Sequence, residues 1–301
     1  MHYRSLGPAF VAFILSAAPT QAADETFDSN GVKIRYVTAG KGEAVVFIHG
    51  WLTDSNMWGT DWLGNTKLKT TSADGFQLIA LDCRGHGKSD KPHDVAKYGP
   101  EMAADVVRLL DHLKIEKAHL IGYSMGSYIA GKVVATHPER VLSVVYAAEA
   151  PLIAGMRSET KSPPEATDVD VFAKAVDEGK DLGAFIIAVS PPDKPKPTEE
   201  RAKAMATLLF AGDDVKAYAA AGRGFKNLAV TEAQLAKCQA PILFIHGARE
   251  SDDVKARVIA VRRLLGRGEV KIIESGDHIS TASDPDFAAA LLEFLGKNKR
   301  K

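Results

Sequence analysis

This sequence has no excess of positive or negative charge, no internal repeat and no apolar run long enough to span a membrane. Its 301 residues include 38 lysines and arginines and 38 aspartates and glutamates, so the formal net charge is zero. Without a basic excess, the chain has no electrostatic footprint for nucleic acid. It also has no low-complexity tract. Its composition is that of a soluble globular protein, long enough for one large α/β domain or two small ones.

Cysteine is scarce as well, because only Cys83 and Cys238 occur. Cys83 follows a predicted strand at 76–82, whereas Cys238 precedes one at 241–246. In a parallel sheet these positions lie at opposite edges, roughly 17 Å apart for a five-residue strand, and a disulfide needs Cα atoms within about 7 Å. We therefore predict two free, buried thiols, and Cys238 is not expected to act as a nucleophile.

One apolar run, Leu6–Ala18, follows a positively charged start but is too short to span a membrane. Thr20 and Ala22 then supply small residues at the −3 and −1 positions of a cleavage site. This order predicts a secretory signal peptide over residues 1–22. No cysteine stands at that site, so a lipid anchor is not expected. We expect a mature protein that starts near Ala23, is periplasmic or secreted, and has no further contact with the membrane.

Strand-like and helix-like segments alternate along the rest of the chain. An antiparallel hairpin is predicted over 26–39, with Asn30-Gly31 at its turn. Further strands are predicted at 44–48, 76–82, 117–121, 141–147, 241–246 and 269–273. Helices are predicted at 101–114, 127–137 and 253–265, and Gly266 is expected to stop the third of these. A last helix is predicted with Asp284 as N-cap and Pro285 at its first position. Such alternation is typical of a mostly parallel central sheet with helices on both faces.

The alternation is interrupted between residues 150 and 230. Two proline-rich stretches, 162–164 and 191–197, cannot form regular helix or strand. Helical patterns occupy 169–178, 198–210 and 213–221. Because this segment is inserted between core strands, we interpret it as a helical cap over the carboxyl edge of the sheet, where open α/β sheets bind ligands. The predicted organisation is a signal peptide at 1–22, a core of 23–149 and 231–297, the cap at 150–230, and a solvated basic tail at 298–301.

The pentapeptide Gly122-Tyr123-Ser124-Met125-Gly126 lies between a predicted strand and a predicted helix. On such a sharp turn the serine hydroxyl is exposed, and the flanking glycines avoid a collision of Cβ atoms with the neighbouring strand or helix. A serine nucleophile needs a base within hydrogen-bond reach and a third group that orients the base. The chain order for this turn is serine, acid, histidine, so both partners are expected further along the chain.

Four other motifs end predicted strands at the same edge of the sheet. They are Phe47–Trp51, Asp82–Asp90, Phe244–Glu250 and Ser275–His278. Together with the pentapeptide they resemble the α/β-hydrolase fold family over nearly all of the mature chain. The H-G-W and D-x-R-G-x-G-x-S motifs resemble the branch that holds small capped esterases, haloperoxidase-like hydrolases, haloalkane dehalogenases and epoxide hydrolases. The resemblance implies an α/β-hydrolase fold whose cap is inserted after the sixth strand.

Matched position by position, the resemblance implies Ser124 as the nucleophile and His278 as the general base. Dehalogenase and epoxide hydrolase members have aspartate at the nucleophile position, because their alkyl-enzyme ester needs a carboxylate. Serine therefore argues against both activities. His49 and His86 lie in turn motifs, where we expect structural hydrogen bonds. The remaining histidines that we consider are expected at the surface: His93, His112 and His137.

The triad acid has more than one candidate. The family position, three residues after Gly247, holds Glu250, and Ser-His-Glu triads are an accepted variant. Asp252 and Asp253 follow closely, so a small shift of the loop would bring Asp252 into place. Glu149 follows another core strand, where some family members keep their acid. Glu250 is the first choice, with the other three as alternates.

Backbone N–H groups are expected to form the oxyanion hole, so only position identifies them. Met125 follows the nucleophile at the start of a helix, whose dipole favours negative charge, and Trp51 matches the second donor. The sequence does not decide whether the side chains of Trp51 and Tyr123 line the pocket or pack in the core. Asp82 and Arg84 are expected to hold their turn.

The sequence thus predicts an exported serine hydrolase that cleaves small carboxylic esters through an acyl-enzyme, without a cofactor. No metal is expected, since no histidine pair has H-x-x-x-H spacing. Activity is expected to rise with pH through about 6 to 7, as His278 loses its proton. The sequence leaves the oligomeric state open.

Several alternatives remain. Lactonases, C–C bond hydrolases, aminopeptidases and perhydrolases use the same triad. The cap has no acidic cluster that would bind an amine, which ranks aminopeptidase below esterase, and no long apolar lid helix that would indicate a lipase. A different class is a non-catalytic ligand-binding protein on the same fold.

Overall fold

The computed structural model describes residues 23–58, 75–156, 167–190 and 195–300. The predicted signal peptide at 1–22 and the proline-rich stretch at 162–164 lie outside the described residues, as does part of the stretch at 191–197. Within the described ranges, no helix combines the length and the apolar character needed to cross a bilayer.

One eight-stranded sheet runs through the molecule in the order β1-β2-β4-β3-β5-β6-β7-β8. The strands are β1 (Ala23–Asp28), β2 (Lys33–Gly40), β3 (Glu43–Ile48), β4 (Phe76–Leu81), β5 (Ala118–Tyr123), β6 (Val141–Ala147), β7 (Ile242–Gly247) and β8 (Glu269–Ile273). The hairpin β1–β2 and the pair β2–β4 are antiparallel, and the other pairs are parallel. Asn30 and Gly31 turn the hairpin with positive φ angles of 58° and 77°. The predicted hairpin and the predicted core strands are confirmed.

From β4 onward, each strand is followed by one or more α-helices. They are α2 (Pro100–His112), α3 (Met125–Thr136), α4 (Asp168–Asp177), α5 (Gly183–Ala188), α6 (Glu199–Leu209), α7 (Val215–Gly224), α8 (Glu232–Ala236), α9 (Asp252–Leu265) and α10 (Pro285–Lys297). Asp284 caps α10 and Gly266 ends α9 in a left-handed conformation, as the sequence predicts. The short helices α5 and α8 were not predicted, although Thr231 and Gln234 form a capping box at α8.

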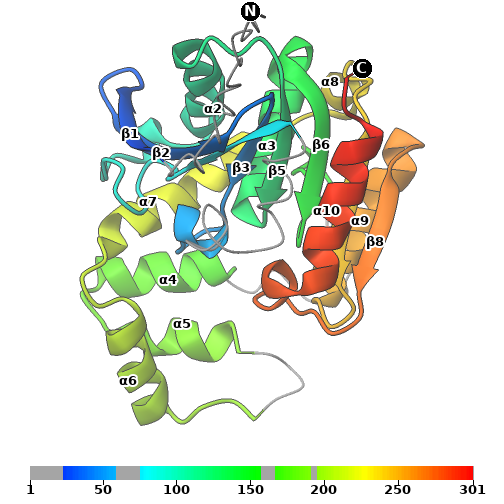
Figure 1. The fold of residues 1–301 in the computed structure, drawn as a ribbon. Helices are drawn as coiled ribbons and strands as arrows, with labels where there is room; N and C mark the ends of the chain where they lie inside the picture. The colour runs from blue at the N-terminus through cyan, green and yellow to red at the C-terminus, as the bar shows by residue number, and fades with distance from the viewer. Residues whose placement is uncertain (1–22, 59–74, 157–166, 191–194, 301) are drawn as a thin grey trace, which may run out of the picture.

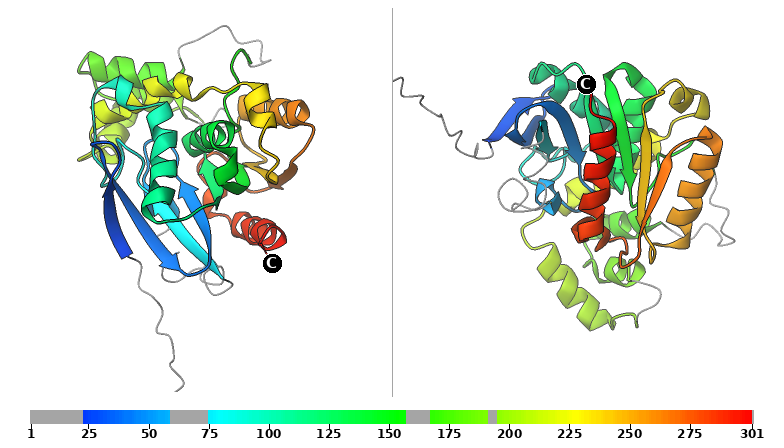
Figure 2. Two further views of the ribbon diagram at one scale, coloured as in Figure 1. Left: turned by 90° about the horizontal axis from the view of Figure 1, so that it is seen from above. Right: turned by 45° about the vertical axis from the view of Figure 1, so that its right-hand side comes forward.

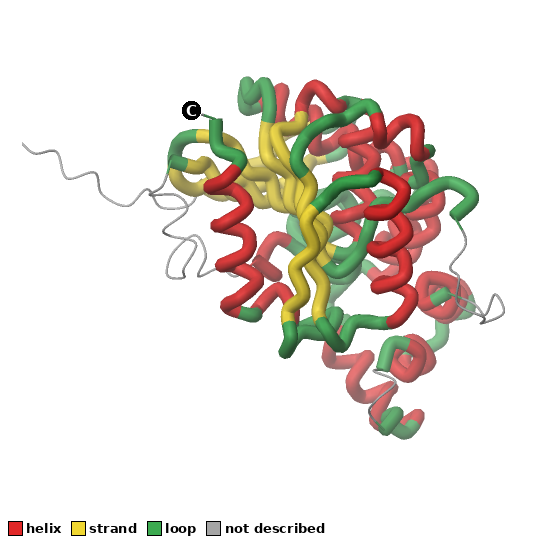
Figure 3. The backbone as a smooth tube through the Cα atoms, turned by 90° about the vertical axis from the view of Figure 1, so that its right-hand side faces the viewer, coloured by secondary structure: helices red, strands yellow, loops and turns green. Residues whose placement is uncertain are grey.

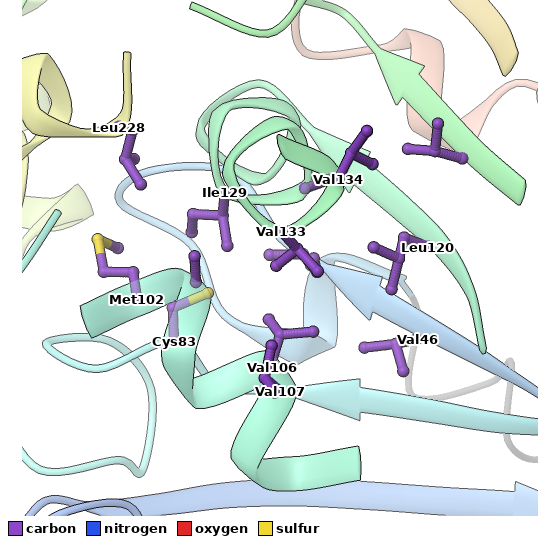
Figure 4. Close-up of a cluster of buried hydrophobic side chains, with 14 of the residues drawn as sticks. Val46, Cys83, Met102, Val106, Val107, Leu120, Ile129, Val133, Val134 and Leu228 are labelled. Atoms are coloured by element: carbon purple, nitrogen blue, oxygen red, sulfur yellow. The ribbon is translucent and has the colours of Figure 1, made fainter. Parts of the chain in front are cut away.

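The sheet separates two apolar layers. On one face, side chains of β3 and β5 such as Val46 and Leu120 pack against Val106 of α2 and Val133 of α3 (Figure 4). On the other face, α10 covers the sheet with side chains that include Leu291. Figure 2 shows α10 on the opposite side of the sheet from α2 and α3. Helices thus cover both faces, and the carboxyl ends of the parallel strands remain available for a site.

The cap helices α4–α7 lie between β6 and β7 in the sequence and beyond one end of the sheet in space (Figure 1). They have a small apolar core of their own, which includes Phe172, Phe185 and Tyr218. Trp51 joins this core to the sheet, because its indole Nε1 donates to the Tyr218 carbonyl at 3.0 Å. The cap interpretation therefore agrees with the arrangement of the helices.

Cys83 and Cys238 are free and buried, as predicted. In the described part of the predicted basic tail, Lys299 and Arg300 are exposed, and both also contact residues of the core domain. The Arg300 Nε lies 2.7 Å from Oε1 of Glu43, and the Lys299 ammonium lies 5.0 Å from the centre of an aromatic ring at the start of β4. The largely buried Glu43 side chain attracts a cation that the local sequence does not provide.

Candidate active site

Ser124 occupies a strained turn between β5 and α3. Its φ of 51° lies in the left-handed region, which non-glycine residues rarely adopt. A Cβ on Gly122 would lie 2.2 Å from the Gly126 carbonyl oxygen, and a Cβ on Gly126 would lie 2.0 Å from the Ile48 carbonyl oxygen. The predicted need for glycine on both sides of Ser124 is therefore confirmed.

A continuous hydrogen-bonded path links Ser124 to a carboxylate. The Oγ atom of Ser124 lies 3.0 Å from Nε2 of His278. The Nδ1 atom of His278 lies 3.1 Å from both carboxylate oxygens of Glu250. Glu250 lies in the loop between β7 and α9 and is buried, whereas His278 lies in the loop after β8. The structure thus brings together the predicted nucleophile, the predicted base and the first-choice acid.

The alternate acids lie elsewhere. The Asp252 side chain, in the first turn of α9, is 92% exposed and pairs with Lys255. Glu149 is buried, but Arg257 binds both of its oxygens at 2.8 and 2.5 Å, and the Tyr128 hydroxyl donates to it at 2.8 Å. Asp253 also lies in the first turn of α9. None of the three is hydrogen-bonded to the His278 ring.

The surroundings of His278 favour its charged form. Burial lowers the pKa of the imidazole, but the hydrogen bond to Glu250 and the charge of Glu250 raise it, and the net pKa lies above the ordinary 6.5. The imidazolium that forms when a base accepts the serine proton is thereby stabilised. The rise of activity with pH is accordingly expected above 6.5 rather than centred between 6 and 7.

Tyr123 has a role that the sequence left open. Its hydroxyl donates to the backbone carbonyl of His278 at 2.8 Å, and its ring packs against Trp58 and Phe287. Burial raises the pKa of the phenol far above its ordinary value, so it remains a donor. Tyr123 thus ties the loop of the base to the nucleophile turn. The motif marks its position, but the sequence has no signal for this long-range bond.

Both predicted oxyanion donors belong to segments that lie next to Ser124. Met125 begins α3 directly after it. The segment that leads to Trp51 passes close by, because a Cβ on Gly50 would lie 3.6 Å from the Ser124 Cβ. The Trp51 ring itself turns into the cap, with ring centres 5.0 Å from Phe172 and 5.7 Å from Phe225.

The turn motifs around the site are structural, as predicted. The His49 ring accepts from the Cys83 N–H at 2.9 Å through Nε2, and its Nδ1 lies 2.7 Å from the Gly50 carbonyl. His86 contacts the Arg84 carbonyl at 3.0 Å. Asp82 accepts backbone N–H bonds from Lys88 in its own turn and from Ser55 in the segment after β3, and Arg84 forms a buried ion pair with Asp105. His93 and His112 are exposed and His137 is half-buried.

The structure has a second cluster of a serine, a histidine and a glutamate, which the sequence did not predict. His119 on β5 lies 2.7 Å from the Ser143 hydroxyl and 3.3 Å from a carboxylate oxygen of Glu43. All three residues lie near the amino-terminal starts of their strands, away from Ser124. Within the described residues, no group of three histidine, cysteine, aspartate or glutamate side chains is placed to hold a metal ion.

Comparison with known sequences gives a family match and several partial relatives. A family model described as alpha/beta hydrolase fold matches residues 43–282. A dihydrolipoyllysine-residue acetyltransferase component of an acetoin cleaving system, from Cupriavidus necator, is 39% identical over 124 residues, 41% of this chain and 31% of that protein. A non-heme haloperoxidase from Rhodococcus erythropolis is 33% identical over 148 residues, 48% of this chain and 49% of the relative. The chain spans about a third to a half of the length of these curated relatives.

Solved structures match over a larger part of the chain. A bromoperoxidase from Bacillus anthracis has a TM-score of 0.72 at 22% identity, covering 91% of this chain and 100% of that one. A structure described with the carboxylesterases of Nitrososphaera gargenis has a TM-score of 0.70 at 19% identity, covering 91% and 98%. At these identities the likeness concerns the fold.

Proposed function

Because the chain belongs to the α/β-hydrolase fold family, whose model covers residues 43–282, we propose that it is a serine hydrolase that cleaves small carboxylic esters. The observation that carries the proposal is the path from Ser124 through His278 to Glu250, with contacts of 3.0 and 3.1 Å. The strained φ of Ser124 and the two crowded glycines around it support the same role.

In the proposed mechanism, the Ser124 Oγ attacks the ester carbonyl while Nε2 of His278 accepts its proton. Glu250 stabilises the resulting imidazolium. The backbone N–H groups of Met125 and Trp51 stabilise the oxyanion, and the loss of one such donor costs about 3 kcal/mol of transition-state stabilisation. His278 then protonates the leaving alcohol. A water molecule, deprotonated by His278, hydrolyses the acyl-enzyme and frees the carboxylic acid.

The preference for small substrates rests on the cap. The helices α4–α7 lie beyond the end of the sheet that carries Ser124 (Figure 1). The side chain of Trp51, whose backbone N–H is a proposed oxyanion donor, is hydrogen-bonded to α7 and packed among cap phenylalanines. Such a roof limits the length of acyl chain that reaches the serine.

A panel of p-nitrophenyl esters of increasing chain length tests this proposal. We expect hydrolysis of the acetate, a decline with longer chains, and rapid labelling of Ser124 by a fluorophosphonate probe. Folded protein that shows neither labelling nor hydrolysis would instead support a non-catalytic ligand-binding role. Hydrolysis of only the long-chain esters would contradict the small-substrate part alone.

The haloperoxidase relative favours one second activity, transfer of the acyl group to hydrogen peroxide. Peroxide would replace water in the attack on the acyl-enzyme, releasing a peracid and regenerating the Ser124 hydroxyl. Peracid formation from acetate and peroxide, lost in Ser124→Ala, would support it. If no peracid forms while esters are hydrolysed at a normal rate, the second activity is contradicted and only the esterase proposal stands.

Export is a separate proposal, supported by the sequence of residues 1–22. Expression of the full chain in a Gram-negative host should give periplasmic or secreted protein whose first residue lies near Ala23. A full-length cytoplasmic product that retains Met1 would contradict it.

A further inference from the structure

A groove with a cavity volume of about 480 Å³ opens between α9 and β8. It is lined by His246, Lys255, Val258, Ile259, Arg262, Arg263, Val270 and Ile272, and none of the three triad residues is among them. Figure 3 faces this side of the molecule, where the last strand of the sheet has a helix on each side. The volume lies within the range of about 300–1,000 Å³ that is usual for small-molecule pockets.

The groove exists because β8 is an edge strand that α9 covers incompletely. Val270 and Ile272 pair in register with Phe244 and His246 of β7, so their side chains lie on the face toward α9. Val270 and Ile272 nevertheless remain 40% and 45% exposed, and Ile259 on α9 is 56% exposed. Apolar side chains that converge from a helix and a strand and still face solvent are typical of a binding surface.

The charged lining of the groove has a single sign. Lys255, Arg262 and Arg263 line it, and no lining residue carries a carboxylate. The Nε atom of Arg262 donates to the Gly268 carbonyl at 2.9 Å, which fixes its guanidinium beside the start of β8. Lys255 is paired with Asp252. The two arginines in the last turn of α9 therefore form the end of the groove that attracts anions more strongly.

We propose that this groove binds a free, single-chain carboxylate of the fatty-acid class. The hydrocarbon chain lies along Val258, Ile259, Val270 and Ile272, and the carboxylate lies at Arg262 and Arg263. Guanidinium groups bind carboxylates through paired N–H donors, which suits this head group. The charge of the lining disfavours a second copy of the chain, since a two-fold interface across the groove would bring the two sets of cations together. This inference does not rest on the proposed function.

Titration calorimetry with decanoate, below its critical micelle concentration, tests the proposal. We expect wild-type protein to bind it, and Ile259→Asp to weaken binding by roughly tenfold or more, since that change removes apolar contact and adds a repelling charge. Leu208→Asp is the matched control, because Leu208 is 79% exposed on α6 of the cap. It should bind decanoate as wild type does, and both variants should retain the wild-type melting temperature.

Two further arms test the charge and the source of the ligand. Arg263→Gln should weaken decanoate binding by about two- to fivefold, and decyltrimethylammonium should not compete with decanoate. Equal binding of the cation would overturn the proposal, as would decanoate binding that is unchanged in both Ile259→Asp and Arg263→Gln. Binding to phosphatidylglycerol vesicles without binding of decanoate would also overturn it. A dimer that Ile259→Asp dissociates, in protein that does not bind decanoate, would do the same.

Discussion

Two clusters, each made of a serine, a histidine and a glutamate, lie at opposite edges of one sheet. At the carboxyl edge, Ser124 and Glu250 flank His278 at 3.0 and 3.1 Å. At the amino edge, Ser143 and Glu43 flank His119 at 2.7 and 3.3 Å. The interatomic distances alone do not separate the two clusters, so their surroundings must account for any difference in chemistry.

The two clusters differ in the backbone conformation of the serine and in the exposure of the side chains to solvent. Ser124 lies on a turn with a φ of 51°, and the His278 side chain is 43% exposed. His119 and Ser143 lie within strands and are fully buried, so no substrate carbonyl can approach them. The charge on Glu43 is also shared with Arg300. Three residue types in contact are therefore insufficient for catalysis, because the nucleophile must be presented on a turn beside the oxyanion donors.

The pKa values of the two histidines are shifted in opposite directions. Glu250 raises the pKa of His278, which favours the imidazolium needed during catalysis. Burial dominates at His119 and lowers its pKa despite the nearby Glu43. The cluster at the amino edge thus holds a neutral histidine and stabilises the packing, whereas the cluster at the carboxyl edge is suited to proton transfer.

Removal of the two serines should separate the clusters most sharply. Ser124→Ala is expected to lower kcat for p-nitrophenyl acetate by up to about 10⁶-fold, because the nucleophile is lost. Ser143→Ala should leave kcat within about twofold, since its hydroxyl only contacts a buried ring. A comparable loss in both variants, measured at equal folded fractions, would break the comparison.

Neutralisation of the two glutamates should give the next largest difference. Glu250→Gln is expected to lower kcat by about 10⁴-fold, because His278 loses the group that orients it and stabilises its charge. Glu43→Gln should retain activity and weaken only the contacts of Glu43 with His119 and Arg300. Asp252→Asn is the control for a nearby exposed carboxylate. Near-normal activity of Glu250→Gln together with inactive Glu149→Gln would move the acid to Glu149.

The pH profile should report His278 and not His119. The half-maximal kcat/KM on the acidic side is expected above pH 6.5, because the pKa of His278 is raised and catalysis needs its neutral form. Glu250→Gln should shift that limb toward lower pH in its residual activity, whereas His119→Gln should leave it in place. An acidic limb below pH 6.5 in the wild-type enzyme would contradict the assigned direction.

Tyr123→Phe should have a smaller effect that is confined to turnover. Losing one hydrogen bond of about 1 kcal/mol to the His278 carbonyl is expected to lower kcat by roughly fivefold with little change in KM. Tyr146→Phe is the matched control, because the buried Tyr146 hydroxyl has no hydrogen-bond partner among the described residues. Equal effects of the two substitutions would assign Tyr123 to packing only.

The smallest expected effect concerns stability at the amino edge. The pKa of His119 is lower in the folded protein than the ordinary 6.5, so the unfolded chain binds more protons. Its contribution to the free energy of unfolding is full above pH 6.5 and is lost as the pH falls below that value. Urea unfolding at several pH values should therefore show a shallower acidic decline for His119→Gln. An identical decline in both proteins would contradict this account.

Local patterns predicted most of the fold. The alternation of residue types located the core strands, and Asp284, Pro285 and Gly266 marked helix ends, because these signals act within a few residues. The helices α5 and α8 were missed because six and five residues are too few for a periodic pattern. The docking of Arg300 on Glu43 and the bond from Tyr123 to His278 join residues that are 257 and 155 positions apart, beyond any local signal.

By itself, the sequence identified the nucleophile turn, because the spacing of Gly122, Ser124 and Gly126 between a predicted strand and a predicted helix is a local pattern. The need for Gly122 is also local, since its Cβ would meet the Gly126 carbonyl, whereas the need for Gly126 comes from the Ile48 carbonyl on the neighbouring strand β3. The sequence did not determine the acid, since Glu250, Asp252 and Glu149 carry the same charge at plausible positions. The tertiary structure decided between them: Arg257 binds Glu149, α9 leaves Asp252 exposed to solvent, and only Glu250 contacts His278. Carboxylates of equal chemistry differ only in the distances and neighbours that the folded chain imposes, and these depend on contacts between distant segments.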